Sequence, residues 1–125
     1  MILDTNAVSD WWRGTPALVR LLRRTDAIHL PAPVLAEYRF GILKSRHQEK
    51  MEIWFEEAKR SATLLPVDAQ TADCYASLRL ALEMKGKKIP MNDLWIAAIA
   101  RQHKLPILSL DTHFDLITGL ERLTW

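Results

Sequence analysis

The chain begins Met1-Ile2-Leu3-Asp4-Thr5-Asn6, three apolar residues followed by an acid, a hydroxyl and an amide. This pattern predicts a short buried strand whose carboxyl end opens onto a polar site. Ligands bind at that edge in open α/β sheets. The same polar residue types also favour helix N-caps, so Asp4 to Asn6 have a purely structural interpretation as the start of a helix. The choice depends on whether other acids occupy equivalent places along the chain.

The length and composition predict one globular domain over residues 1–125. A chain of this length buries about two-thirds of its unfolded surface on folding. Its residues are 49% apolar and 26% charged, which argues against disorder. The formal net charge of +2 is too small to imply a nucleic-acid partner by itself.

Cysteine usage and hydropathy predict a complete, soluble, cytoplasmic chain without a membrane anchor. Cys74 is the only cysteine, so no intrachain disulfide forms and a reducing compartment fits. The N-terminus lacks the basic and apolar regions of a signal peptide. The longest apolar run, residues 94–100, is far shorter than the roughly 20 residues that cross a bilayer.

Apolar periodicity and turn residues predict strands that alternate with helices. We expect further strands at 28–30, 63–65 and 106–110, and a last one that includes Leu123. Helices are expected as a pair within 8–25, and at 33–44, 49–62, 69–85 and 93–103, the last two with Asp68 and Asn92 as N-caps. This alternation indicates an α/β fold built on a mainly parallel sheet.

Four acids fall at comparable places in this scheme. Asp4 and Asp111 each follow a buried strand, so their carboxylates emerge at the same edge of a parallel sheet. Asp93 begins a helix that is apolar on nearly every side, where the helix dipole favours its ionised form. Glu37 lies in the helix after strand 28–30, four residues before Gly41. A glycine costs about 1 kcal/mol inside a helix, which suggests that something packs closely against this face.

Each acid has a structural explanation alone, as a cap, a turn residue or part of a solvated face. Together they need a counter-charge, because each close pair of carboxylates costs on the order of 4 kcal/mol at an effective dielectric constant of 20. Oxygen ligands with few histidines favour Mg²⁺ or Mn²⁺ over zinc. Such ions suit in-line attack on a phosphodiester, and hence hydrolysis of nucleic acid. Metal-bound waters or the carboxylates could be oriented by Thr5, Asn6, Asn92 and Ser109.

Two other classes of protein gather acids on a similar fold. A receiver or phosphotransfer domain requires an acid pair near the first strand and a lysine after the last one, and neither is evident. A phosphatase with an aspartate nucleophile requires a second Asp two residues after Asp4, where this chain has Asn6.

Motif order makes the chain similar to PIN-domain proteins, and in particular to the VapC-type toxin ribonucleases of toxin–antitoxin pairs. The similarity spans the whole chain. Its motifs are Ile2-Leu3-Asp4-Thr5-Asn6, Leu35-Ala36-Glu37 with Gly41, Pro90-Met91-Asn92-Asp93-Leu94-Trp95-Ile96-Ala97-Ala98, Leu108-Ser109-Leu110-Asp111-Thr112-His113-Phe114, and Gly119-Leu120 before a short strand.

This resemblance implies a three-layer α/β/α sandwich and endonucleolytic cleavage of RNA. By motif position, it implies that Asp4, Glu37, Asp93 and Asp111 hold Mg²⁺ or Mn²⁺ and are catalytic; Asp115 is a ligand through water or a surface acid. It also implies a homodimer that binds a small VapB-type antitoxin. A PIN-like module that binds RNA or a partner without cutting stays open as an alternative.

An acidic pocket needs basic neighbours to hold a polyanion. The candidates are Arg13, Arg39, Lys44, Arg46, Lys85, Lys87 and Lys88. The loop from Lys85 to Lys88 is the clearest cluster, although a solvated charge run is the ordinary explanation. Trp11 and Trp12 are adjacent on a helix and cannot both face one core, so one of them is a candidate for contact with a base or with the antitoxin.

Overall fold

Five short strands form one sheet in the computed structural model, which describes residues 1–125. The strands are β1 (Ile2–Leu3), β2 (His29–Pro31), β3 (Thr63–Leu65), β4 (Ile107–Leu108) and β5 (Arg122–Leu123). Their order in the sheet is β3-β2-β1-β4-β5, and every neighbouring pair is parallel. The predicted parallel sheet is confirmed.

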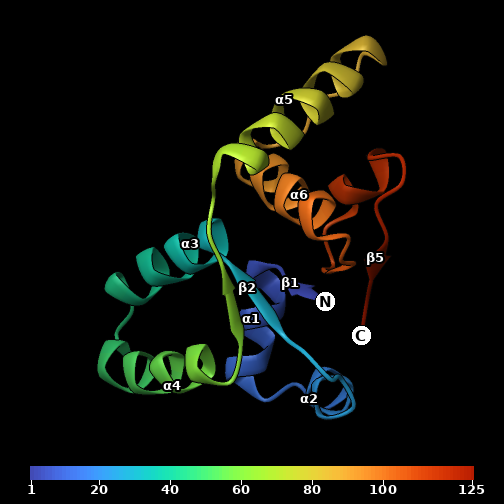
Figure 1. The fold of residues 1–125 in the computed structure, drawn as a ribbon. Coiled ribbons are helices and arrows are strands. Elements are labelled where there is room, and N and C mark those ends of the chain that lie inside the picture. Colours follow the sequence, from blue (N-terminus) through green and yellow to red (C-terminus); the bar gives the residue numbers. More distant parts are fainter.

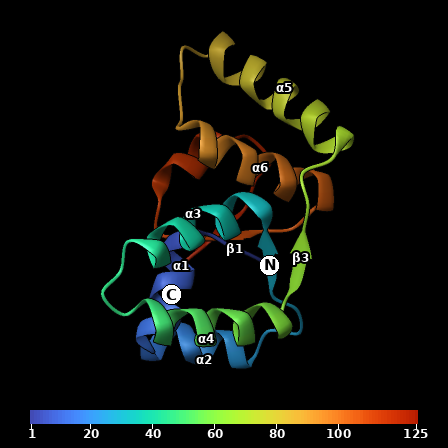
Figure 2. The ribbon, with the colours of Figure 1, turned by 90° about the vertical axis from the view of Figure 1, so that its left-hand side faces the viewer.

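Six α-helices and one 3₁₀ helix connect the strands (Figure 1). They are α1 (Thr5–Arg13), α2 (Pro16–Arg23), α3 (Ala32–Leu43), α4 (Gln48–Arg60), α5 (Ala69–Met84), α6 (Met91–His103) and the 3₁₀ helix η1 (Thr112–Leu116). Figure 2 shows α5 and α6 on one side of the strands and α2 and α4 on the other, as in a three-layer sandwich. None of these helices combines the length and hydropathy that a bilayer crossing requires.

Two details of the predicted elements were wrong. The strand predicted at 106–110 is confined to Ile107–Leu108. Asn92 does not cap α6, because the helix already begins at Met91 with Pro90 in the N-cap position. Proline suits a helix start because its φ angle is fixed near the helical value and no backbone N–H is lost there. The Asn92 side chain is thereby free for another contact.

The core is centred on β1, β4 and α6. Ile2 lies opposite Ile107 and Leu3 opposite Leu108, and all four side chains are fully buried. Helix α6 is buried continuously from Ile96 to Ala100, which confirms the prediction from its composition. The two sequence-distant strands and α6 therefore form the rigid base beneath the loops that carry the acids.

Aromatic side chains pack helices α1, α3 and α4 against one another. Trp11 and Trp12 of α1 both pack edge-on against Trp54 of α4, with ring centroids 5.4 and 5.5 Å apart. Tyr38 of α3 lies 4.9 Å from the ring of Phe55, which is also buried. The expectation that adjacent tryptophans cannot both pack inward was wrong, because Trp54 lies between them at the helix interface.

The sheet order produces one topological switch point, and we refer to the edge of the sheet there as the crevice. From β1 the chain moves outward to β2 and β3, whereas from β4 it moves in the opposite direction to β5. The connections that leave β1 and β4 therefore diverge to opposite sides of the sheet, which is the switch point where open α/β sheets bind ligands. Asp4 follows β1 and Asp111 follows shortly after β4, so both acids lie at this point.

Two isoleucine substitutions test which residues belong to the core. Ile99→Ala, at a fully buried position of α6, should lower the free energy of unfolding by about 2–5 kcal/mol through lost burial and a residual cavity. Ile53→Ala, at a position of α4 that is 66% exposed, should change it by less than about 0.5 kcal/mol. Urea denaturation followed by circular dichroism measures both, and equal losses would contradict the assigned core.

Candidate active site

Asp4 ends β1 and begins α1 at once. Its backbone N–H donates to Leu108 O at 3.1 Å, so Asp4 still follows the ladder with β4. Its side chain caps α1 and accepts from the Thr5 N–H at 2.8 Å. The predicted helix cap and the predicted polar site are thus the same residue. Only 4% of Asp4 is exposed, and this burial raises the pKa of its carboxyl group.

Ser109 and Asn6 fix the second carboxylate oxygen of Asp4. Ser109 Oγ donates to Asp4 Oδ2 at 2.6 Å, and Asn6 Nδ2 donates to the same atom at 2.9 Å. Ser109 Oγ also accepts from the Asp111 N–H at 2.9 Å. One buried hydroxyl therefore joins the loops that follow β1 and β4, and holds two acids of the crevice in register.

Glu37 reaches the same region from α3. Thr5 Oγ1 and Asn92 Nδ2 donate to its Oε2 atom at 2.8 and 2.7 Å. Both bonds go to one oxygen, so Oε1 is available to a ligand. The close packing predicted at Gly41 was wrong, because a Cβ atom at this position would have no neighbour within 4 Å.

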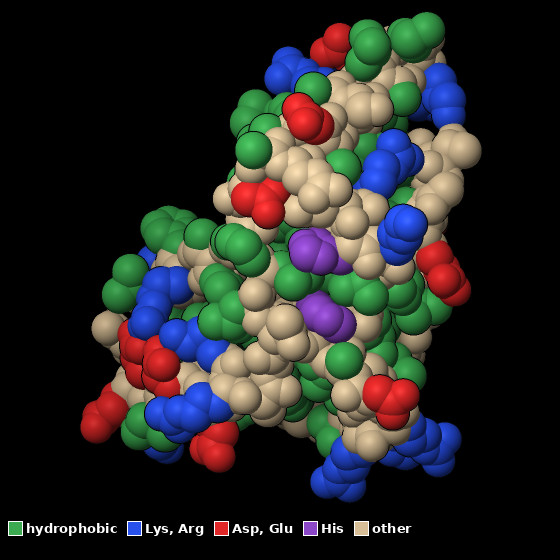
Figure 3. Space-filling model, viewed as in Figure 1, with side chains coloured by type: hydrophobic (Ala, Val, Ile, Leu, Met, Phe, Trp, Pro, Cys, Tyr) green, Lys and Arg blue, Asp and Glu red, His purple; other side chains and the backbone are tan.

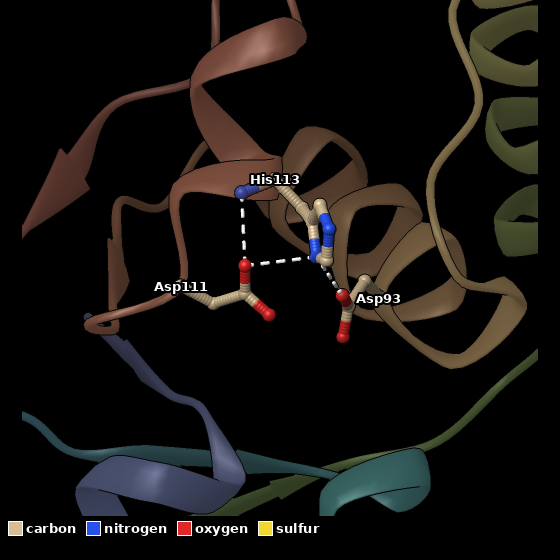
Figure 4. Close-up of side chains that lie close together, drawn as sticks. All are labelled: Asp93, Asp111 and His113. Carbon is tan, nitrogen blue, oxygen red and sulfur yellow. Dashed lines mark hydrogen bonds and ion pairs between the residues drawn. The ribbon is translucent and has the colours of Figure 1, made fainter.

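Asp93, Asp111 and His113 form the most compact group of the site (Figure 4). His113 Nδ1 lies 2.8 Å from Asp111 Oδ1 and 3.2 Å from Asp93 Oδ2. Asp111 is the N-cap of η1 and accepts from the His113 N–H at 2.9 Å. The next residue, Phe114, is fully buried and anchors η1 to the core. Backbone bonding and packing together hold the imidazole against the acids.

The acids act on one another electrostatically. Burial first, and then the negative charges of Asp111 and Asp4, raise the pKa of Asp93 to about 6. Glu37 and Asp111 also contribute to the raised pKa of Asp4. In turn, the bond to Asp111 is the largest cause that raises the pKa of the His113 imidazole. The four predicted acids therefore share one negative field at the crevice.

His113 was not predicted as a site residue. No lysine or arginine lies beside Asp4, Asp93 or Asp111 in the sequence. The available signal was the spacing of His113 two residues after Asp111, just before a residue that the core requires, Phe114. Histidine is the only basic residue that forms an ion pair with Asp93 or Asp111.

This set of donors fits a divalent cation. Three aspartates and a glutamate supply oxygen atoms, and no lysine or arginine ion pair neutralises Asp4, Asp93, Asp111 or Glu37. Charged carboxylates that raise one another's pKa are stabilised by a bound cation. The residue types match the oxygen-ligand preference of Mg²⁺ and Mn²⁺.

Asp115 does not lie with the other acids. It forms a two-point ion pair with Arg122, with both N–O distances 2.7 Å, and this contact lowers the pKa of Asp115. Arg122 also donates to Ser109 O at 3.1 Å. Asp115 and Arg122 therefore brace the loop after β4 from its outer side.

The predicted basic residues divide into two groups. Arg13 pairs with Asp10, Arg39 with Glu52 and Glu56, and Lys85 donates to Thr118. Lys87 and Lys88, like Lys44 and Arg46, are exposed and form no ion pair. On the face shown in Figure 3, lysine and arginine side chains lie among acidic ones and do not form one continuous field.

Several known proteins resemble this chain in sequence and in fold. A family model described as the PIN domain matches residues 1–120. Ribonuclease VapC5 of Mycobacterium tuberculosis is 34% identical over 75% of this chain and 71% of its own length. Toxin FitB of Neisseria gonorrhoeae is 31% identical over 90% of this chain and 88% of its own. The crystal structure of VapBC2 from Rickettsia felis, bound to a promoter DNA fragment, superposes with a TM-score of 0.88 at 26% identity, covering 99% of this chain and 97% of that one.

The raised pKa of Asp93 makes stability depend on pH. A carboxyl group with a pKa of about 6 in the folded state and about 3.8 unfolded favours folding at low pH, and this contribution is lost as pH rises from about 4 to about 6. Asp93→Asn lacks the titrating group. In metal-free buffer, its stability relative to the wild type should therefore rise across that interval and level off above it.

Urea denaturation between pH 4 and pH 8, with a chelator present, measures this difference. Asp73→Asn, which removes an exposed acid of α5, is the matched control and should follow the wild-type curve. A flat or falling relative stability of Asp93→Asn would show that Asp93 keeps an ordinary pKa.

Proposed function

Because the chain belongs to the PIN-domain family, we propose that it is a metal-dependent endoribonuclease that acts as the toxin of a toxin–antitoxin pair. The observation that carries this proposal is the meeting of Asp4, Glu37, Asp93 and Asp111 at the switch point of the sheet. The names of the similar proteins, ribonuclease VapC5 and toxin FitB, agree with it. The sequence expectation of RNA cleavage is thus retained on independent grounds.

The four acids would hold one or more divalent ions, Mg²⁺ or Mn²⁺. When bound, such an ion supplies positive charge at the phosphodiester and lowers the pKa of an attacking water. Glu37 is the most exposed of the four acids, and the side chains of Asp93 and Asp111 are 14% and 31% exposed, so all three present oxygens to solvent. Asp4 is buried beneath them and contributes through its fixed negative charge and its remaining lone pair.

The surrounding polar residues would keep the carboxylates in position during the reaction. Ser109 and Asn6 restrain Asp4, while Thr5 and Asn92 restrain Glu37. The bonds from Ser109, Thr5 and Asn92 link different elements and fix them against one another, whereas the Asn6–Asp4 bond lies within the start of α1. Preorganised groups of this kind need no rearrangement when charge develops at the phosphate.

Lys87 and Lys88 would contact the RNA backbone. They lie in the loop just before α6 and line a cavity of about 450 Å³ together with Tyr75, Arg79 and Met91. Met91 is followed directly by Asn92 and Asp93, so this basic wall adjoins the acids. Exposed ammonium groups without ion pairs offset the repulsion between an acidic crevice and a polyanion.

The remaining parts of the proposal concern assembly and setting. We propose a VapB-type antitoxin as the partner, since the structures similar to this chain include toxin–antitoxin complexes. We also propose a homodimer, as the family resemblance implies, and a cytoplasmic setting, where cellular RNA is found. Residues 1–125 would form one PIN-like domain, of which the family model covers residues 1–120.

Removal of one acid should abolish cleavage. With Mg²⁺ or Mn²⁺ present, Asp4→Asn and Asp93→Asn should cut total cellular RNA at least about 100-fold more slowly than the wild type, because the preorganised charge is lost. Asp73→Asn is again the control and should retain full activity, whereas chelation of the metal should stop all cleavage. Fragment yields on denaturing gels provide the rates.

Undiminished cleavage by Asp4→Asn and Asp93→Asn would contradict the assigned site. If the wild type binds RNA without cutting it under any metal condition, the protein is a binding module and the proposed activity is wrong.

Lys87 and Lys88 should contribute to the affinity for RNA in a salt-dependent way. In an Asp93→Asn background, which prevents cutting, the double change Lys87→Ala with Lys88→Ala should weaken RNA binding. It should also reduce the slope of log K against log salt by about 1.4, or about 0.7 for each lost phosphate contact. Lys50→Ala, which removes an exposed lysine of α4, should leave the slope unchanged. Fluorescence anisotropy at several salt concentrations measures the slope, and an unaltered slope in the double variant would remove this loop from the interface.

A further inference from the structure

The imidazole of His113 bridges two acids of the site. Its Nδ1 atom is within 3.2 Å of carboxylate oxygens from two different elements, Asp93 of α6 and Asp111 after β4. One ligand atom from each of the three residues can be chosen so that all lie within 4.8 Å of one another. Figure 4 shows the ring between the two carboxylates.

The distances from His113 Nδ1 to the oxygens of Asp93 and Asp111 match those between neighbouring ligand atoms around a six-coordinate ion. Ligand bonds of about 2.1 Å at right angles place neighbouring donor atoms about 3.0 Å apart. The two Nδ1–oxygen distances are 2.8 and 3.2 Å, one on each side of that value. Phe114 and the η1 backbone hold the backbone of His113 in place, and the contacts of Nδ1 with both acids position the ring, so the nitrogen requires no large movement to reach a shared ion.

We propose that His113 is a protein ligand to the divalent ion of this site and makes the site selective for Mn²⁺ over Mg²⁺. This inference rests on the proposed function, since it concerns the same ion. Magnesium prefers oxygen ligands, whereas an imidazole nitrogen is a better ligand for transition-metal ions. A site of carboxylates alone discriminates less between the two ions. His113 is therefore the residue that sets the metal preference.

If His113 is instead only a counter-charge, the expected effect on metal binding is different. If the imidazole is only a counter-charge that bridges Asp93 and Asp111, an incoming ion must displace it. Removal of the ring would then strengthen the binding of both ions or leave it unchanged. If the ring is a ligand, its removal weakens binding and does so more for Mn²⁺.

Spectroscopy on the full-length chain tests the nitrogen ligand without reference to activity. The protein is loaded with Mn²⁺, and electron spin echo envelope modulation is recorded for the wild type, His113→Ala and His103→Ala. His103 is an exposed histidine ten residues beyond Asp93 on α6, about 15 Å away along the helix. We expect nitrogen modulation in the wild type and His103→Ala, and its loss in His113→Ala.

Titration calorimetry supplies the affinities for Mn²⁺ and Mg²⁺ separately. His113→Ala should bind Mn²⁺ about 10-fold more weakly and Mg²⁺ less than about 3-fold more weakly, so that the preference largely disappears. His113→Gln should behave as the alanine variant does, because an amide does not restore the nitrogen ligand. Circular dichroism checks that each variant is folded.

Three outcomes overturn the inference. Mn²⁺ bound without nitrogen modulation, or equal or tighter binding by His113→Ala, would show that His113 is only a counter-charge, and the proposed metal site would stand. If the wild type shows no binding of Mn²⁺ or Mg²⁺ that is lost in Asp93→Asn, both the ligand role of His113 and the metal dependence proposed above are wrong.

Discussion

The parallel pairing of β1 with β4 fixes the chemistry of this protein. Each strand has only two residues, yet the Asp4 N–H continues the ladder to Leu108 O and Ser109 Oγ reaches back to Asp4. The loops that carry Asp4 and Asp111 therefore cannot move apart without breaking both backbone and side-chain bonds. Because the chain diverges from these two strands in opposite directions, the crevice and its acids are consequences of the same topology.

Electrostatic repulsion at this crevice is opposed in two ways. Hydrogen bonds from Ser109, Asn6 and Thr5 compensate for the burial of Asp4, and the His113 imidazole contacts both Asp93 and Asp111. Several other basic side chains are held in ion pairs away from the four acids, as the pairing of Arg122 with Asp115 and of Arg39 with Glu52 shows. The small net charge of the chain thus conceals a local separation of charge, with acids in the crevice and two free lysines beside it.

Much of this arrangement could be predicted from local sequence. Apolar segments identified the strands and helices because β1, β4 and α6 are buried on nearly all sides. The positions of Asp4 and Asp111 after strands predicted that these two acids share an edge of the sheet. Contacts between distant segments could not be predicted. The bond from Asn92 to Glu37 joins residues 55 positions apart, and the packing of Trp11 and Trp12 depends on Trp54 of α4. His113 was missed for the same reason, since its role depends on where Asp93 lies.

The double position of Asp4 has an evolutionary consequence. As the N-cap of α1 it can be replaced by asparagine, which caps helices about equally well, and the codons for the two residues differ by one base. The cap alone therefore exerts little selection for the negative charge; the bonds that Asp4 Oδ2 accepts from Ser109 and Asn6, and the chemistry of the site, do so. A lineage that no longer needed this chemistry could lose it in a single step while the protein kept its shape and its surfaces. Descendants of such an event would be recognisable by an intact architecture around a neutral residue at the end of the first strand.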